Sequence, residues 1–362
     1  MEQAYHTAVS RVGAATLEVL AALEQAARHL DPPLLPRLRK ILAPRGDALR
    51  DALDAFLDER PPDGLEELGK QLGEAAGFAS RAVRQFVEPP ANTGVAAILE
   101  CMRLHCRALE SLYPLRRALP PVARFFSEPA LHERVEQLDP EPPAGVKTGI
   151  LHAPGPGREG ERGGFWLYVP ERYDGSANWP LVVALHGGSG QGRDFLWTWL
   201  REARSRRVLL AAPSSLGPTW SFLGEDVDAA RLRALVARIA EGWRVDRERV
   251  LLTGLSDGAT YTLFSGLQKG APWTALAPLS GVLHPSLLSS GALERARGRR
   301  IWLVHGARDW MFPVAVARMA RDALQKAGAE LSYQELPDLS HTYAREQNGP
   351  ILEWFDPALA AD

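Results

Sequence analysis

The pattern of apolar and polar positions changes near residue 145. From Thr148 onward, short apolar runs that suit buried strands alternate with longer amphipathic stretches at residues 229–243 and 314–327. This alternation is typical of an α/β domain with a mostly parallel sheet and helices on both faces. The strands that we predict are residues 165–169, 181–186, 208–212, 250–254, 275–279, 301–305 and 331–334.

Before residue 138 the apolar positions follow a helical period instead. Between residues 65 and 86 they recur at alternating spacings of three and four, which places them on one face of a helix. Prolines at residues 32–33, 44, 61–62, 89–90 and 120–121 predict breaks between helices. We therefore expect residues 1–137 to form an all-α bundle of about five or six helices with short connections. A packing or homo-oligomerisation module is the favoured role, and a lid over a substrate site is the alternative.

The segment between these two regions is rich in proline. Residues 138–147 contain three prolines and a glycine, which is typical of a linker. All ten tryptophans lie at or beyond Trp166. The sequence therefore predicts a helical domain at 1–137, a linker at 138–147 and a separate α/β domain at 148–362.

Polar residues follow the predicted strands, and one such stretch is chemically distinctive. Residues 254–258 read Gly-Leu-Ser-Asp-Gly between an apolar run and a stretch that suits a helix. In this context the pattern is that of a nucleophile elbow, a tight strand-to-helix turn that exposes the hydroxyl of Ser256. Gly254 and Gly258 suit the turn because a side chain at either position would collide with the neighbouring strand or helix.

A serine nucleophile requires a base, and the base requires an acid that orients it. Asp309 and His341 each follow a predicted strand, and the carboxyl ends of parallel strands share one edge of the sheet. We therefore predict a triad of Ser256, His341 and Asp309. The rivals left open are His305 and His284 for the base, and Asp338 and Glu335 for the acid. His186 is expected to hold its loop by hydrogen bonds.

The order serine, aspartate, histidine is that of the α/β-hydrolase fold. Residues 148–356 resemble this family, specifically its phospholipase/carboxylesterase, feruloyl-esterase and polyhydroxybutyrate-depolymerase-like branch. The matching stretches are residues 185–188 (Leu-His-Gly-Gly), 254–258, 305–309 (His-Gly-Ala-Arg-Asp) and 340–341 (Ser-His). The resemblance does not extend to the N-terminal helices. It implies an oxyanion hole made by the backbone N–H groups of Gly188 and Asp257.

Asp257 departs from the family pattern, because many members carry an uncharged residue after the nucleophile. A carboxylate facing the site would oppose a developing oxyanion, so we expect this side chain to point away. Aromatic residues cluster after the same strands, and Trp220 and Trp310 are the predicted substrate-pocket residues.

Composition excludes several other classes of protein. The formal net charge is −2, which gives no electrostatic reason to expect nucleic acid or a membrane as a partner. No apolar run approaches the length of about 20 residues that a membrane span needs, and the acidic N-terminus does not look like a secretory signal, so we expect a cytoplasmic location. Cys101 and Cys106 are too far apart on a helix to form a disulfide. No metal or organic cofactor is implied.

The sequence thus predicts a serine esterase that acts on a small-molecule or acyl-ester substrate through a covalent acyl-enzyme. A peptidase, thioesterase or acyltransferase that uses the same triad is the alternative within the fold. A hydrolase-like scaffold without catalysis is the alternative outside it. The acyl and alcohol specificity is not encoded in any motif of this sequence.

Overall fold

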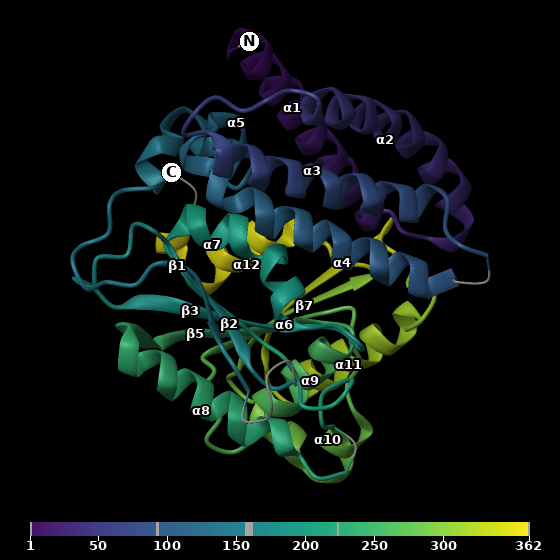
Figure 1. Ribbon diagram of the computed structural model, residues 1–362. Coiled ribbons are helices and arrows are strands. Elements are labelled where there is room, and N and C mark those ends of the chain that lie inside the picture. The colour runs from purple at the N-terminus through teal and green to yellow at the C-terminus, as the bar shows by residue number, and fades with distance from the viewer. Residues whose placement is uncertain (1, 92–93, 156–161, 223, 361–362) are drawn as a thin grey trace. The chain divides into compact units, whose positions relative to one another are not determined.

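The chain folds into two compact units, residues 1–137 and 138–362. The structure is a computed structural model that describes residues 2–91, 94–155, 162–222 and 224–360. Figure 1 shows the helices of the first unit in purple and blue, and the sheet and helices of the second in teal, green and yellow. None of the helices in these described ranges is long and apolar enough to span a membrane.

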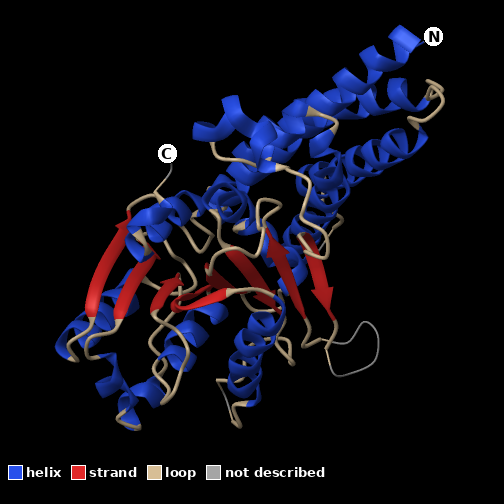
Figure 2. Ribbon diagram, turned by 90° about the vertical axis from the view of Figure 1, so that its left-hand side faces the viewer, coloured by secondary structure: helices blue, strands red, loops and turns tan. Residues whose placement is uncertain are grey.

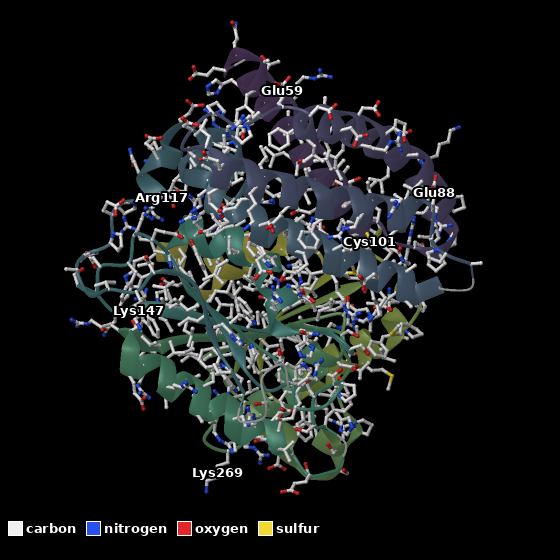
Figure 3. All side chains as sticks on the ribbon, in the orientation of Figure 1. Glu59, Glu88, Cys101, Arg117, Lys147 and Lys269 are labelled. Atoms are coloured by element: carbon white, nitrogen blue, oxygen red, sulfur yellow. The ribbon has the colours of Figure 1, made fainter. Side chains whose placement is uncertain are left out.

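The first unit is entirely helical. Its α-helices are α1 (Glu2–Arg28), α2 (Leu35–Leu57), α3 (Glu66–Val87), α4 (Gly94–Leu112) and α5 (Pro120–Phe125). Short 3-10 helices precede α2 and α5, and a longer one, Pro129–Leu138, follows α5. The stripe predicted on α3 is buried at Leu72, Ala75, Ala79, Ala82 and Phe86. Its small alanines allow close packing of α3 against α4 and α2. Cys101, labelled in Figure 3, is buried on α4, and burial raises the pKa of its thiol to about 12.

One predicted helix break is wrong. Pro44 lies inside α2, which continues without interruption from Leu35 to Leu57. Leu42 and Leu49, on either side of the proline, are both almost fully buried. A break would remove one of them from the core, so their burial outweighs the hydrogen bond that the proline cannot make. Gly46, two residues later, allows close packing, because a Cβ atom there would lie 3.1 Å from Cγ1 of Val83 on α3.

The second unit confirms the predicted α/β architecture. In its described residues, eight strands form one sheet in the order β1-β2-β4-β3-β5-β6-β7-β8. The strands are β1 (Gly149–Ala153), β2 (Phe165–Val169), β3 (Trp179–Leu185), β4 (Leu209–Pro213), β5 (Val245–Leu255), β6 (Ala275–Leu279), β7 (Arg300–Gly306) and β8 (Glu330–Leu336). β1 and β2 pair antiparallel at one edge, and the strands from β4 to β8 pair parallel.

Helices cover both faces of this sheet, as Figures 1 and 2 show. α8 (Val227–Gly242), α9 (Asp257–Gly266) and α11 (Val314–Lys326) cover one face, and α7 (Leu200–Arg206) and α12 (Asn348–Phe355) cover the other. The short helices α6 (Gly192–Phe195) and α10 (Pro285–Ser289) lie in loops after strands. The central strands β3, β4 and β6 are buried along their whole length, which explains their continuous apolar sequence.

The start of the predicted linker is anchored within the second unit. Leu138 is buried, and the carboxylate of Asp139 accepts a hydrogen bond from the guanidinium of Arg204 on α7. Arg204 is fully buried and lies 4.0 Å from a carboxylate oxygen of Glu171. This buried ion pair fixes the point at which the chain enters the α/β unit.

Candidate active site

The turn between β5 and α9 holds Ser256 in a strained backbone conformation. Its φ is 55° and its ψ is −118°, a region that residues with a side chain rarely adopt. Two glycines make the turn possible. A Cβ atom on Gly254 would lie 2.5 Å from the carbonyl oxygen of Gly258, and one on Gly258 would collide with the carbonyl oxygen of Leu185 on β3. The serine is thereby held at the carboxyl end of β5, directly before the N-terminus of α9.

Three side chains from three separate strand ends meet at this turn. His341, which follows β8, has Nε2 2.9 Å from Oγ of Ser256. Its Nδ1 lies 2.8 Å from Oδ2 of Asp309, which follows β7. Asp309 is 5% exposed, and its Oδ1 accepts hydrogen bonds from the backbone N–H groups of Met311 (3.0 Å) and Phe312 (2.7 Å). The structure thus brings together the three residues predicted as a triad, in hydrogen-bonding order.

The two predicted oxyanion donors come from segments near the serine: Asp257 follows it directly, and a Cβ atom added to Gly187, the neighbour of Gly188, would lie 3.5 Å from Cβ of Ser256. Asp257 is the first residue of α9, so its N–H has no partner within the helix. In the described ranges, neither this N–H nor that of Gly188 donates a hydrogen bond to any residue. The loop that carries Gly188 is held by the N–H of Ser189, which donates to the carbonyl of Pro218 at 2.8 Å. Two fixed donors beside a nucleophile are suited to stabilise negative charge on a carbonyl oxygen.

The prediction that the Asp257 side chain points away is wrong. Its Oδ2 accepts a hydrogen bond from Oγ1 of Thr219 at 2.6 Å, and a Cβ atom added to Gly188 would lie 2.7 Å from the same oxygen. The carboxylate therefore faces the Gly188 loop. The hydroxyl of Thr219, on a loop distant in sequence, provides the donor that holds it there.

Comparisons with known proteins agree with this architecture. Residues 228–354 match the family described as Phospholipase/Carboxylesterase. Together with the mostly parallel eight-stranded sheet, this match gives the second unit the α/β-hydrolase fold.

Curated relatives match only part of this chain. A probable feruloyl esterase C of Aspergillus terreus is 25% identical over 122 residues, which cover 32% of this chain and 45% of that protein. Acyl-protein thioesterase 1 of Neurospora crassa is 24% identical over 118 residues, which cover 32% and 48%. The chain thus spans less than half the length of these relatives. Among solved structures, a thermostable esterase is similar with 21% identity and a TM-score of 0.47, covering 57% of this chain and 61% of that chain.

His186 of the α/β unit supports the loop that carries Gly188. It is 1% exposed, with Nδ1 2.7 Å from the carbonyl oxygen of Gly187. The N–H of Ser215 donates to Nε2 at 3.1 Å, so the ring is neutral with its proton on Nδ1. Burial lowers the pKa of His186 to about 4, and the nearby charge of Arg162 also lowers it. These contacts agree with the structural role predicted for this histidine.

Trp220 has a structural environment and not that of a substrate-pocket residue. It is 2% exposed, its indole N–H donates to the carbonyl of His186 at 2.8 Å, and its ring stacks on Tyr261. It borders a cavity of about 330 Å³, but neither Ser256 nor His341 lines that cavity. The physical reason is that the apolar ring is more stable in the core, where its N–H also has an acceptor.

Trp310 has the opposite environment. It is 52% exposed, and its ring lies 6.3 Å from the ring of His341. Phe312 packs perpendicular to the same imidazole at 5.1 Å. An exposed indole beside the base is suited to contact a bound substrate. Its part in a substrate pocket stays a prediction.

The rival residues have other partners. His305 is fully buried, and its Nε2 lies 2.8 Å from the carbonyl oxygen of Phe312 and 3.5 Å from Oδ2 of Asp309. His284 caps α10 through the N–H of Ser286. Glu335 accepts two hydrogen bonds from Arg318, which lower the pKa of this carboxyl to about 2. Asp338 lies in the loop between β8 and His341. None of these rivals is hydrogen-bonded to Ser256 or His341 in the described ranges.

Proposed function

We propose that this protein is a serine hydrolase that cleaves carboxylic esters through a covalent acyl-enzyme. The observation that carries the proposal is the continuous hydrogen-bonded series from Ser256 through His341 to Asp309. A serine hydroxyl becomes a useful nucleophile when a neutral imidazole accepts its proton. The family match over residues 228–354 supports ester hydrolysis as the reaction class.

In the first half-reaction, Oγ of Ser256 attacks the ester carbonyl while Nε2 of His341 takes the hydroxyl proton. Asp309 keeps the remaining proton on Nδ1 and stabilises the imidazolium. The N–H groups of Gly188 and Asp257 donate to the oxygen that becomes negative. His341 then gives its proton to the leaving alcohol, and an acyl-serine remains.

In the second half-reaction, water takes the place of the alcohol. His341 accepts a proton from the water, whose oxygen attacks the acyl carbonyl. The bond between the acyl carbon and Oγ of Ser256 then breaks, and His341 returns the proton to Oγ as the carboxylic acid leaves. Every proton transfer uses the same nitrogen, so one base serves both steps. Besides water and the substrate, these steps use the side chains and backbone donors already described.

The substrate is a small-molecule ester or an acyl group on a carrier. One relative is named a feruloyl esterase and another an acyl-protein thioesterase, so oxygen esters and thioesters are the two acyl donors to compare first. A peptidase or acyltransferase would use the same triad. Side-by-side assays of an aryl ester, a thioester and a peptide distinguish these activities.

The decisive experiment replaces the nucleophile. Ser256→Ala is expected to lower kcat for p-nitrophenyl acetate by at least about 10³-fold, because no acyl-enzyme can form. Ser289→Ala, on an exposed serine at the end of α10, is the matched control and keeps full activity. Turnover by Ser256→Ala close to that of the control would remove Ser256 from the mechanism.

Residues 1–137 are proposed to be a separate packing or homo-oligomerisation module joined through residues 138–147. Several large apolar side chains on its surface support this role, namely Ile41, Leu57 and Met102. Light scattering of the full chain over a range of concentrations tests it. A monomer at all concentrations would instead favour the lid.

A further inference from the structure

The carboxylate of Asp257 occupies an unexpected place beside the nucleophile. It is neither buried nor fully exposed, and it faces the Gly188 loop. Its Oδ2 accepts the hydrogen bond from Thr219, whereas no residue in the described ranges donates to Oδ1. One carboxylate oxygen is thus used by the fold, and the other remains available as an acceptor.

The fold alone does not account for the negative charge. An acidic residue in the first turn of α9 is favourable, because the helix N-terminus carries partial positive charge. However, the same positive end is needed for the oxyanion, and a carboxylate turned toward Gly188 opposes it. An asparagine would accept the hydrogen bond from Thr219 equally well. The carboxylate differs from the amide in its negative charge. For a substrate that is apolar near its carbonyl, this charge disfavours formation of the oxyanion.

The position of the carboxylate also indicates which part of the substrate it meets. The leaving alcohol lies beside Nε2 of His341, which must protonate it, and the groups that pack against this imidazole are Trp310 and Phe312. The carboxylate of Asp257 lies instead against Gly188 and Thr219, on two other loops. With the alcohol beside His341, we expect the acyl chain to be the part of the substrate that approaches the free oxygen of Asp257.

We infer that Asp257 is a specificity-determining residue that recognises acyl chains carrying a hydrogen-bond donor, either a hydroxyl or an ammonium group, close to the ester carbonyl. This inference rests on the proposed ester hydrolysis. A donor on the acyl chain satisfies Oδ1 and, when it is cationic, offsets the charge that opposes the oxyanion. A plain aliphatic acyl chain leaves Oδ1 without a donor and does not offset the negative charge of the carboxylate.

Three p-nitrophenyl esters of equal chain length test the inference. Their acyl groups are butanoyl, 3-hydroxypropanoyl and 3-aminopropanoyl, which end in a methyl, a hydroxyl and an ammonium group. The measured quantity is kcat/KM for each polar ester divided by that for the butanoyl ester, compared between the wild type and Asp257→Asn. This double ratio cancels the intrinsic reactivity of the esters.

We expect the substitution to lower the ratio about tenfold for the ammonium ester and about threefold for the hydroxyl ester. The butanoyl ester itself is expected to react faster with the variant.

The matched control removes a carboxylate elsewhere. Asp322→Asn, at an exposed position paired with Arg321 on α11, changes the net charge of the protein equally and leaves both ratios as in the wild type. A second measurement needs no variant at the site. Raising the salt concentration is expected to lower the wild-type preference for the ammonium ester, because salt screens a partly exposed charge pair.

The outcomes separate the inference from the function on which it rests. Equal ratios in the wild type and Asp257→Asn, with hydrolysis that still requires Ser256, would overturn the inference and leave the esterase proposal intact. A charge effect that appears only when the ammonium group is on the alcohol, as in 2-aminoethyl against propyl benzoate, would also overturn it. Hydrolysis of none of the three aryl esters would overturn both. If Asp257→Asn does not fold, a salt-independent wild-type preference is the result that contradicts the inference.

Discussion

Replacing Asp309 by asparagine tests the acid of the triad, and the structure specifies how the amide must lie. Oδ1 of Asp309 accepts from the backbone N–H groups of Met311 and Phe312, whereas Oδ2 faces Nδ1 of His341. Two N–H donors require an acceptor, so the amide oxygen of Asp309→Asn stays with them. The NH₂ group is then placed against His341. Nδ1 of the imidazole must then act as an acceptor, so the ring proton moves to Nε2. Nε2 faces Ser256, and once it carries this proton it cannot accept the hydroxyl proton.

The size of the effect follows from this loss of the base. The equivalent exchange in a serine protease lowers kcat by about 10⁴-fold through the same change of tautomer, and we expect a loss of about 10³–10⁴-fold here. This corresponds to about 4–5.5 kcal/mol of transition-state stabilisation. The assay is kcat/KM for an aryl ester, with thermal unfolding measured in parallel to show that the variant is folded.

The chain offers a matched control in the rival acid. Glu335→Gln removes a carboxylate at the end of β8 that is paired with Arg318, and it is expected to keep wild-type activity within about twofold. Asp309→Asn with activity within tenfold of the wild type would refute the assignment. A loss of about 10³-fold in Glu335→Gln would refute it as well, because it would make Glu335 the acid.

Three further predictions concern the supports of the site and the helical unit. His186 has a folded pKa of about 4, below its usual 6.5, so the free energy of unfolding is expected to fall by roughly 2–3 kcal/mol as the pH drops from 6.5 to 4. Urea unfolding of His186→Gln should show a weaker pH dependence. The same dependence of the unfolding free energy on pH in the wild type and the variant would contradict this. Gly188→Ala places a Cβ atom 2.7 Å from the Asp257 carboxylate, so kcat should fall about 10²–10³-fold, whereas Gly217→Ala, with its nearest contact at 3.4 Å, should behave as the wild type. Pro44→Ala should raise the free energy of unfolding of residues 1–137 by about 1–3 kcal/mol, because it restores a hydrogen bond within α2. An unchanged melting temperature of the variant would contradict this.

The sequence alone was sufficient to predict most of the sheet and the convergence of the triad residues. Buried parallel strands are continuous apolar runs, and this local signal identified seven strands. Residues that follow such strands share one edge of the sheet whatever their separation along the chain. Ser256, Asp309 and His341 could therefore be grouped without knowledge of the distances between them.

The edge of the sheet was not predictable in the same way. β1 (Gly149–Ala153) was missed because it is only half buried and pairs with β2 alone, so no continuous apolar run marks it. β5 begins at Val245, before the charged residues 246–249, although the apolar run begins at Val250. Pairing with neighbouring strands, which is a non-local property, determines both boundaries.

The directions of individual side chains could not be predicted from the sequence either. Asp257 faces the Gly188 loop because Thr219, on a different loop, supplies a donor. Trp220 is buried because Tyr261 and the carbonyl of His186 provide a ring contact and an acceptor. Each contact joins segments that are distant in sequence, and no local pattern reports it.

Reaction with a fluorophosphonate is the most direct test of the central claim, because the reagent forms a stable adduct only with an activated serine. The protein is incubated with the reagent, and its intact mass is measured by mass spectrometry. The modified peptide is then identified by sequencing after digestion. We predict a single adduct on Ser256, which is lost in Ser256→Ala and formed much more slowly in Asp309→Asn. An unmodified protein, or an adduct on any other residue, would contradict the account.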